Sequence, residues 1–500
     1  MASSLAKGAA QQGNPADGGK TFFGHPRGLA TLFMTEMWER YSFYGMKALL
    51  PLYLIAPGGM NMNPATATAI YSVYMSMVYL LAMPGGWVAD RFWGPRKTVI
   101  VGGAVVILGH LTLALPSAGF FFAGLALVAL GSGLLKANIS TMVGHLYSGP
   151  TDPRRDGGFT LFYIGINLGA FLAPLSIGTI GEDVNWHIGF ALAAVGMALG
   201  LTQFLIGTRH LSATSDLVSK PATPEDKAKV LRQGLIWLAV AAVFYVVVVA
   251  AGLYTINWAL VPLTLAGLFI PVAVLFRMKR DKELTGEEQS KLSGYIWFFV
   301  LAAVFWMIYD QNGSTLSIFG EKSTTNQLFG FDFPTSWYQS LNPIFIMALA
   351  PVVASAWLWL NKRDKEPSTA VKFASSLGLI GVSFVVFLIP LIDTAANGGR
   401  VSPMWLVAVY FVQTVGELCL SPVGLSVTTK MAPAKYGSQM MGVWFLAVTS
   451  GDSVTGLLST AGVDLNTTFA VGVEAAVAVA AGLGIWTARK RIKELMGSVN

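Results

Sequence analysis

Apolar stretches long enough to cross a lipid bilayer recur along the whole chain, separated by short polar segments. A spanning helix needs about 20 mainly apolar residues, because the hydrocarbon core is roughly 30 Å thick. Such stretches predict fourteen membrane helices, at 29–55, 66–89, 97–116, 119–141, 157–180, 187–207, 234–252, 256–276, 293–319, 334–360, 369–391, 402–427, 438–460 and 467–488. The expected fold class is therefore an all-α polytopic membrane protein.

The polar segments divide these spans into six, two and six. A charged linker, Thr208–Gln233, precedes the middle pair, and a basic loop, Arg277–Lys291, follows it. This order predicts two six-helix bundles joined by an inserted helical hairpin. Many secondary transporters are built from such repeats, with the substrate site between them near the midplane. The expected parts are a tail at 1–28, an N-terminal bundle at 29–207, the linker with two extra helices at 208–292, a C-terminal bundle at 293–488 and a tail at 489–500.

The basic residues predict the orientation. Of 33 Lys and Arg residues, Arg40, Lys47 and Lys136 fall inside spans, and Lys322 and Arg400 fall on one side of the membrane. The other 28 (33 − 3 − 2) fall on the opposite side. Cytoplasmic loops carry the excess of Lys and Arg, so we expect both termini in the cytoplasm.

Composition excludes several classes of protein. Only 12% of the residues are charged and 54% are hydrophobic, whereas soluble domains have about 25% charged residues. The loops explain the net charge of +7, so no nucleic-acid partner is expected. One cysteine and no H-E-x-x-H or paired-His pattern leave no predicted metal site, cofactor or membrane-embedded enzyme. The longest polar stretch, Thr208–Gln233, is too short for a receptor's signalling domain.

Charged side chains inside the first span point to function. A charge at membrane depth costs at least ~2.5 kcal/mol on insertion scales, so such residues are rarely incidental. Glu36, Glu39 and Arg40 lie three and four residues apart and share one helical face. One Arg cannot balance two carboxylates, so the cluster needs a proton or another cation. Lys136, at a similar depth in the fourth span, is the expected cation, and Lys47 lies two turns further along the first helix.

The second half contributes charges of the opposite sign. Asp310 lies at the depth expected for Lys47, and Glu417 lies mid-depth in its span. A cleft that is cationic on one wall and anionic on the other would orient a zwitterionic dipeptide end-on. Packed ion pairs that merely hold helices together are the alternative, but the sorting of charge by half favours function. Asp452 has no obvious partner, and for it both interpretations stay open.

Several motifs carry a family resemblance. Gly86–Lys97 resembles the major facilitator signature between its second and third helices, with one extra residue before the second Gly. Glu36–Gly45 resembles E-x-x-E-R-F-x-Y-Y-G, the first-span motif of the proton-dependent oligopeptide transporter family, except at Tyr41 and Phe43. Other segments similar to that family are Phe162–Gly169, Phe305–Trp306 with Asp310–Ser314, Gln339–Pro343 and Gly416–Ser426.

The resemblance implies a major facilitator fold and a monomeric symporter, without cofactor, that imports di- and tripeptides with protons by alternating access. The two-helix insert is typical of bacterial members and implies the inner membrane. By position, it implies proton coupling by Glu36, Glu39, Arg40, Lys136, Asp310 and Glu417, and an outer gate made by Lys47 and Asp310. It implies peptide contacts from Arg40, Tyr44, Tyr79, Lys136, Asn167, Trp306, Asp310, Asn342, Glu417, Ser421 and Trp444.

Within these contacts, the resemblance assigns the peptide carboxylate to Arg40, Lys136 and Asn167, and the amino terminus to Asn342 and Glu417. The aromatic residues would line side-chain pockets; for them, bundle packing or a membrane-interface belt is the alternative. A second function also stays open, because the family includes carriers of nitrate and other anions. Those carriers typically lack the acidic residues of the first-span motif, so Glu36 and Glu39 weigh against it.

Overall fold

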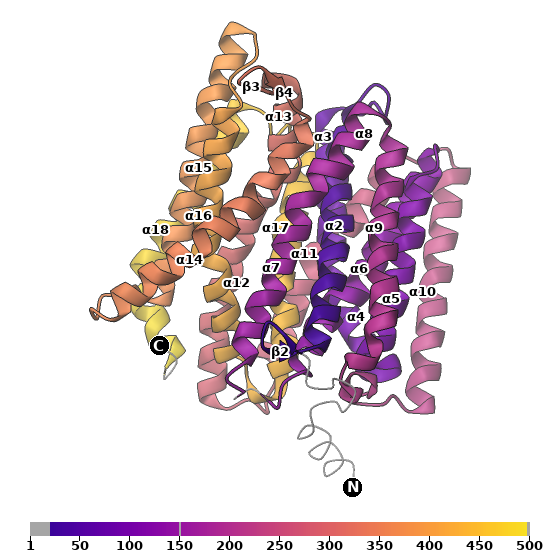
Figure 1. Cartoon of the computed structure of the whole chain (residues 1–500), viewed down its shortest axis with the longest axis vertical. Helices are drawn as coiled ribbons and strands as arrows, with labels where there is room; N and C mark the ends of the chain where they lie inside the picture. The colour runs from indigo at the N-terminus through magenta and orange to yellow at the C-terminus, as the bar shows by residue number, and fades with distance from the viewer. Residues whose placement is uncertain (1–20, 150–151, 498–500) are drawn as a thin grey trace.

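The computed structural model describes residues 21–149 and 152–497, and most of this part of the chain is helical. Its strands form two short antiparallel hairpins. They are β1 (Thr21–Phe22) with β2 (His25–Pro26), and β3 (Gln327–Leu328) with β4 (Phe331–Asp332). The all-α prediction is confirmed. In Figure 1, β2 and the end of α18 (Thr468–Met496) lie toward the lower end of the molecule, whereas β3 and β4 lie at the other end.

The first set of helices, here called the N-half, contains the first six predicted spans. Its elements are α2 (Gly28–Ile55), α3 (Pro64–Leu80), α4 (Ala82–Val88), the π-helix η2 (Ala89–Trp93), α5 (Gly94–Leu113), α6 (Ala118–Gly144), α7 (Arg155–Ala173), the π-helix η3 (Pro174–Gly178), α8 (Thr179–Asp183) and α9 (Trp186–Gly207). Local chemistry sets several of these starts. Asn63 accepts a hydrogen bond from Thr66 N ahead of α3, and Asn185 accepts hydrogen bonds from His187 N and Ile188 N ahead of α9.

The predicted insert is a pair of helices that follows two short 3₁₀ turns. These elements are η4 (Thr208–His210), η5 (Ala213–Asp216), α10 (Pro224–Ala250) and α11 (Asn257–Lys279). Helix α10 begins ten residues before the predicted 234, because Thr223 and Asp226 form a capping box around Pro224. The second part of the predicted linker is therefore helical. The part before it lies against the signature loop, where Lys220 N donates to Asp90 O at 2.9 Å.

The last set, here called the C-half, contains the remaining six predicted spans. Its elements are α12 (Gly286–Tyr309), η6 (Asp310–Gly313), α13 (Thr315–Ser323), η7 (Thr335–Ser340), α14 (Leu341–Asn361), α15 (Thr369–Asn397), α16 (Met404–Lys430), η8 (Ala434–Tyr436), α17 (Gly437–Thr460) and α18. The 3₁₀ turn η6 interrupts the predicted span 293–319 at Asp310. This break places the acidic side chain at the end of one helix and ahead of the next.

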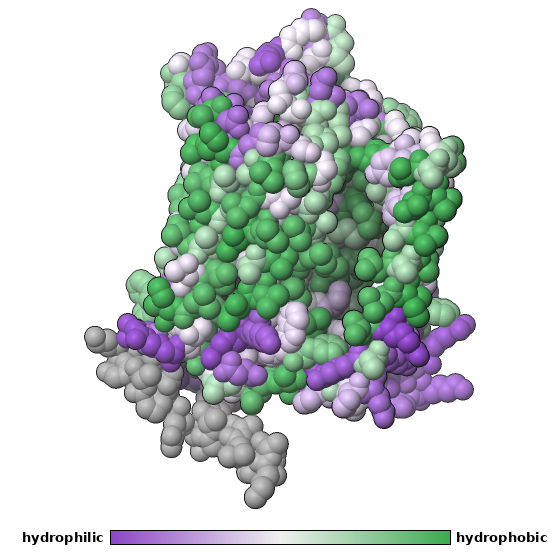
Figure 2. Space-filling model, turned by 90° about the vertical axis from the view of Figure 1, so that its right-hand side faces the viewer, coloured by the Kyte–Doolittle hydropathy of each residue, from purple (hydrophilic) through white to green (hydrophobic). Residues whose placement is uncertain are grey.

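Twelve helical stretches of the described chain are long and apolar enough to cross a membrane. Pro64–Leu113 is one of these stretches, although it contains both α3 and α5, which were predicted as separate spans. Helix α2 is absent from the twelve, because every 18-residue window in it holds at least three of Glu36, Glu39, Arg40 and Lys47. Figure 2 shows a broad hydrophobic belt between two hydrophilic ends. The chain is a multi-pass membrane protein.

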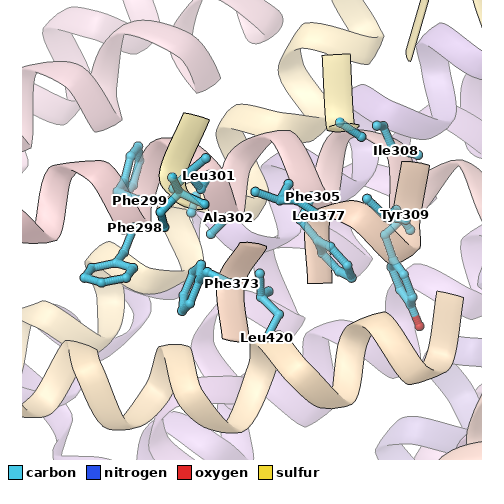
Figure 3. Packing of buried hydrophobic residues seen from close by; sticks show 14 of the residues in the cluster. Phe298, Phe299, Leu301, Ala302, Phe305, Ile308, Tyr309, Phe373, Leu377 and Leu420 are labelled. Carbon is cyan, nitrogen blue, oxygen red and sulfur yellow. The ribbon is translucent and has the colours of Figure 1, made fainter. Parts of the chain in front are cut away.

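The C-half has its own aromatic core. Phe298 and Phe305 of α12 are fully buried with Phe373 and Leu377 of α15 and Leu420 of α16 (Figure 3). The rings of Phe298 and Phe373 lie 4.8 Å apart. This packing holds α12 in place, and α12 leads directly into the break at η6.

The two halves meet along α3 and α17. Ser76 Oγ and Ser453 Oγ are 2.8 Å apart, and Tyr79 stacks on Phe445 with ring centroids 6.0 Å apart. Helix α11 lies over this seam, where Gly267 approaches Ser76 and Ser453 so closely that a Cβ would lie 2.6 Å and 2.0 Å from their hydroxyl oxygens. In contrast, α10 is largely exposed along its length.

Candidate functional site

The acidic-basic cluster of α2 forms as predicted. Arg40 Nε lies 2.6 Å from Glu36 Oε1 and 3.2 Å from Glu39 Oε2, and both carboxylates are 1% exposed. Helix α7 packs directly on this face, since a Cβ at Gly169 would lie 2.2 Å from Met37 O and 3.1 Å from Arg40 Cβ. Within the part of the chain that the structure describes, Glu36 Oε2 and Glu39 Oε1 are buried without a hydrogen-bond partner. The cluster therefore has carboxylate oxygens free to hold a proton.

Lys136 lies near this cluster, close enough for the charges of Glu36 and Glu39 to act on its ammonium, but it forms no direct ion pair with either carboxylate. Within the described residues, the Lys136 ammonium makes no ion pair and no hydrogen bond, although Lys136 is only 8% exposed. It lies over the rings of Phe43 and Tyr79, 4.2 Å and 4.3 Å from their centroids. The two aromatic faces also stabilise the cation. Lys136 is therefore a buried cation that forms no direct ion pair among the described residues.

Lys47 and Asp310 meet as the depth comparison predicted. Lys47 Nζ of α2 lies 3.4 Å from Asp310 Oδ1 of η6, and both side chains are buried. The carboxyl of Asp452, on α17, lies close enough to Asp310 for the two charges to interact. The sequence left Asp452 without a partner, and the structure places it near Asp310.

Glu417 lies in a polar pocket built from three helices of the C-half. Its Oε2 accepts a hydrogen bond from Tyr309 OH at 2.6 Å and another from Asn342 Nδ2 at 2.9 Å. Asn342 also donates to Thr414 Oγ1 at 3.1 Å. The predicted pair of Asn342 and Glu417 is thus brought together. Sequence reasoning missed Tyr309, because spacing along one helix does not show which side chains of distant helices meet.

The remaining predicted residues differ in their surroundings. Asn167 donates to Tyr163 O of its own helix at 3.0 Å. The Trp306 indole nitrogen and the Ser421 hydroxyl are buried and have no hydrogen-bond partner among the described residues. Trp444 is 3% exposed and packs so tightly that a Cβ at Gly424 would lie 1.9 Å from its ring. In this conformation, Trp444 is part of the core, the packing alternative given above.

Tyr44 lies between the charges of the two halves. Arg40 and Lys47 of the N-half and Glu417 and Asp310 of the C-half are all close enough for their charges to act on its hydroxyl. Lys47 Nζ is 5.6 Å from the centre of its ring. The structure thus gathers cations of one half and carboxylates of the other around one aromatic side chain. This arrangement can hold a small molecule that carries both an amine and an acid.

Known proteins resemble this chain closely. It is 40% identical to the di-/tripeptide transporter of Lactococcus lactis subsp. cremoris over 496 residues, which cover 96% of this chain and 98% of that protein. It is 37% identical to the peptide transporter YePEPT of Yersinia enterocolitica over 459 residues, 88% of this chain and 89% of the relative.

Solved structures share the whole fold. A crystal structure of the peptide transporter POT in complex with sulfate matches with a TM-score of 0.91 and 41% identity, over 98% of each chain. A POT family transporter in complex with 5-aminolevulinic acid matches with a TM-score of 0.89 and 35% identity, over 95% of this chain and 98% of that one. The model of the POT family matches residues 96–473. The chain belongs to the POT family.

Proposed function

We propose that this chain is a proton-coupled symporter that imports di- and tripeptides across the bacterial inner membrane by alternating access. The observation that carries the proposal is the sorting of charge around Tyr44. Arg40 and Lys47 of the N-half face Glu417 and Asp310 of the C-half there. Lys136 of the N-half is a further buried cation, with no direct ion pair among the described residues. A peptide carries a carboxylate at one end and an ammonium at the other, so it would complete both sites.

The names of the relatives support this substrate class, since two of them are called di-/tripeptide or peptide transporters. The 5-aminolevulinic acid in a related structure also carries an amine and an acid on one small molecule. The proposed peptide contacts are Arg40, Tyr44, Tyr79, Lys136, Asn167, Trp306, Asp310, Asn342, Glu417, Ser421 and Trp444. Trp444 would reach the peptide only after the core around it rearranges.

Proton coupling is assigned to the buried carboxylates. Protonation of Glu36 or Glu39 would release Arg40, and protonation of Asp310 would break its pair with Lys47. Each change alters the balance between two orientations of the halves. The protein alternates between outward-facing and inward-facing conformations. Substrate and proton are coupled because each shifts the same equilibrium between these two conformations.

Each part of the chain then has a role in transport and a side of the membrane. The N-half and C-half act as the two moving bodies, with the hairpin of α10 and α11 inserted between them in sequence. Both termini lie in the cytoplasm, in keeping with the Lys and Arg distribution. The end that carries α8, β3 and β4 then faces outward. The monomer contains the whole pathway, because each half supplies one wall.

Reconstitution into liposomes tests the proposal. An acid-outside gradient should drive accumulation of labelled dialanine, and a proton ionophore should abolish it. A carrier that accumulated nitrate or an organic anion, and was not inhibited by dialanine, would refute the peptide assignment. Equal dialanine uptake with and without the gradient would refute the coupling.

A further inference from the structure

A single carboxylate joins the two halves at the end of the molecule that carries β3 and β4. Glu182 lies in the short helix α8 of the N-half (Figure 1). Its Oε2 accepts a hydrogen bond from Thr335 N at 2.9 Å, and its Oε1 accepts one from Ser336 N at 2.8 Å. Thr335 and Ser336 open η7 of the C-half, which continues into α14. The first amides of a helix have no partner inside it, so an anion is well placed there.

Neighbouring contacts hold the same two segments together. Trp337 Nε1 donates to Thr179 Oγ1 at 2.8 Å, and Ser340 Oγ donates to Phe171 O at 2.8 Å. Close packing accompanies these bonds, since a Cβ at Gly178 would lie 2.1 Å from the Ser336 hydroxyl. Among the described residues, the hydrogen bonds between the N-half and the C-half come from this region, the Lys47 pair and the α3–α17 seam.

The charges around Glu182 leave it dependent on the two amides. Thr335 Oγ1 donates to Glu321 Oε2 at 2.6 Å, so a second carboxylate faces the same residue from α13. Asp183 follows on its own helix, and His187 of α9 has its Nδ1 3.3 Å from Leu113 O. In the described chain, Glu182 forms no ion pair with Lys or Arg. The contact is therefore a pair of charge-assisted hydrogen bonds from two neutral amides to a carboxylate, and no Lys or Arg of the described chain pairs with that carboxylate.

We propose that Glu182 is a proton-released latch of the outer gate, closed when the carboxylate is ionised and opened when a proton from outside binds it. The inference rests on the proposed function, because that function assigns this end to the outside. Glu182 is a positioning residue: it holds η7 against η3 and α8, and it touches no proposed substrate contact.

Release of the latch follows from the number of hydrogen bonds that the Glu182 side chain can accept. An ionised carboxylate presents two acceptor oxygens, one to each amide. A neutral carboxyl carries its hydrogen on one of them, so a donor then faces a donor and one bond is lost. Hydrogen bonds to charged groups are stronger than those between neutral groups, so neutralisation should shift the gate equilibrium roughly tenfold or more. The proton can return to the same side, so the latch responds to acidity without being part of the transport stoichiometry.

Distance measurements between spin labels test the latch. Labels at Val184→Cys in the N-half and Phe329→Cys in the C-half, both strongly exposed, would report opening in a Cys419→Ala background by double electron–electron resonance. At pH 8, we expect Glu182→Gln to raise the fraction of molecules with a long label-to-label distance roughly tenfold. This fraction should approach that of the labelled protein with Glu182 at pH 5. Glu182→Asp, which keeps the charge, should restore part of the pH response.

Asp183→Asn is the matched control, because it removes the adjacent carboxylate, which is exposed and forms no hydrogen bond to η7 among the described residues. Its distances should follow pH as those of the parent do. If Glu182→Gln and Asp183→Asn gave the same pH profile, the latch would be refuted. This readout needs no peptide and no gradient. A pH-dependent latch without dialanine uptake would refute the proposed function alone, whereas normal uptake with a pH-insensitive gate would refute the latch alone.

Discussion

Lys47 Nζ lies 3.4 Å from Asp310 Oδ1, and this pair joins the first helix of the N-half to the break in the first helix of the C-half. Both side chains are buried, so their charges interact in a medium of low dielectric constant. Asp452 lies close enough for its charge to act on Asp310, so two carboxyls and one ammonium lie near one another. A movement of either half would separate groups that stabilise one another only in this conformation.

Removal of one partner of this pair should be more harmful than removal of both. Lys47→Met or Asp310→Asn alone leaves a buried group unpaired, which destabilises a protein by about 3–5 kcal/mol. The double variant should recover much of the lost thermal stability in detergent, yet still lack gradient-driven dialanine uptake. Additive losses in the double variant would mean that the two side chains do not interact.

Neutralisation of Glu36 should separate driven uptake from exchange. Glu36→Gln keeps the shape of the side chain and one acceptor for Arg40, but it cannot take up a proton. We expect loss of gradient-driven accumulation, with exchange of labelled for unlabelled dialanine preserved. Glu225→Gln, at the exposed start of α10, is the control and should behave as the parent. If gradient-driven uptake survived in Glu36→Gln, this cluster would not be the site of proton coupling.

The close contact between α7 and α2 should leave no room for an added methyl group. Gly169→Ala would place a Cβ 2.2 Å from the Met37 carbonyl oxygen, and backbone cannot move aside as a flexible side chain can. Overpacking of this kind costs about 1–3 kcal/mol, so the melting temperature should fall. Gly484→Ala in α18 meets nothing within 4 Å and should not lower it. Equal melting temperatures for the two variants would contradict the close contact.

Lys136 should recognise the carboxylate of the peptide. We expect the parent to bind dialanine better than dialanine amide, because the amide lacks the negative charge. Lys136→Ala should bind both compounds weakly and with similar affinity. Tyr79→Leu removes one of the two rings over the ammonium, a contribution of about 0.5–2 kcal/mol, and should weaken binding less. Competition against labelled dialanine measures all of these affinities. If Lys136→Ala still bound dialanine better than dialanine amide, another residue would bind the peptide carboxylate.

An ion pair outside the membrane should make stability depend on pH. Lys435 Nζ donates to Asp281 Oδ2 at 2.7 Å, and together with the Tyr436 hydroxyl it lowers the pKa of Asp281. A depressed folded-state pKa contributes stability that is present above the unfolded pKa of about 3.9 and is lost as pH falls toward the folded value. Asp281→Asn should thus melt below the parent from pH 5 to 8, and the difference should narrow below about pH 4.

The control for this measurement is Glu494→Gln, at the exposed end of α18, which should track the parent at every pH. A melting difference between Asp281→Asn and the parent that stayed constant down to pH 3 would show that the ion pair does not carry the effect.

The sequence predicted helices well and cross-helix partners only in part. Apolar length is a property of one segment, so the spans could be predicted from it, and shared depth was enough to pair Lys47 with Asp310. Depth alone placed Lys136 near the cluster but did not show that Phe43 and Tyr79, rather than a carboxylate, lie directly against its ammonium. Glu182 gave no signal, because its partners are backbone amides, which every residue type except proline offers.

Helix α11 has a further consequence for transport. It lies across the line where α3 and α17 meet, with Gly267 wedged against Ser76 and Ser453. If the halves rock, this helix must shear against at least one of them, and it draws α10 through the surrounding lipid. The hairpin would then move through the lipid with each change of conformation. We expect the rate of the proposed transport cycle to depend on the viscosity of the bilayer as well as on the supply of protons.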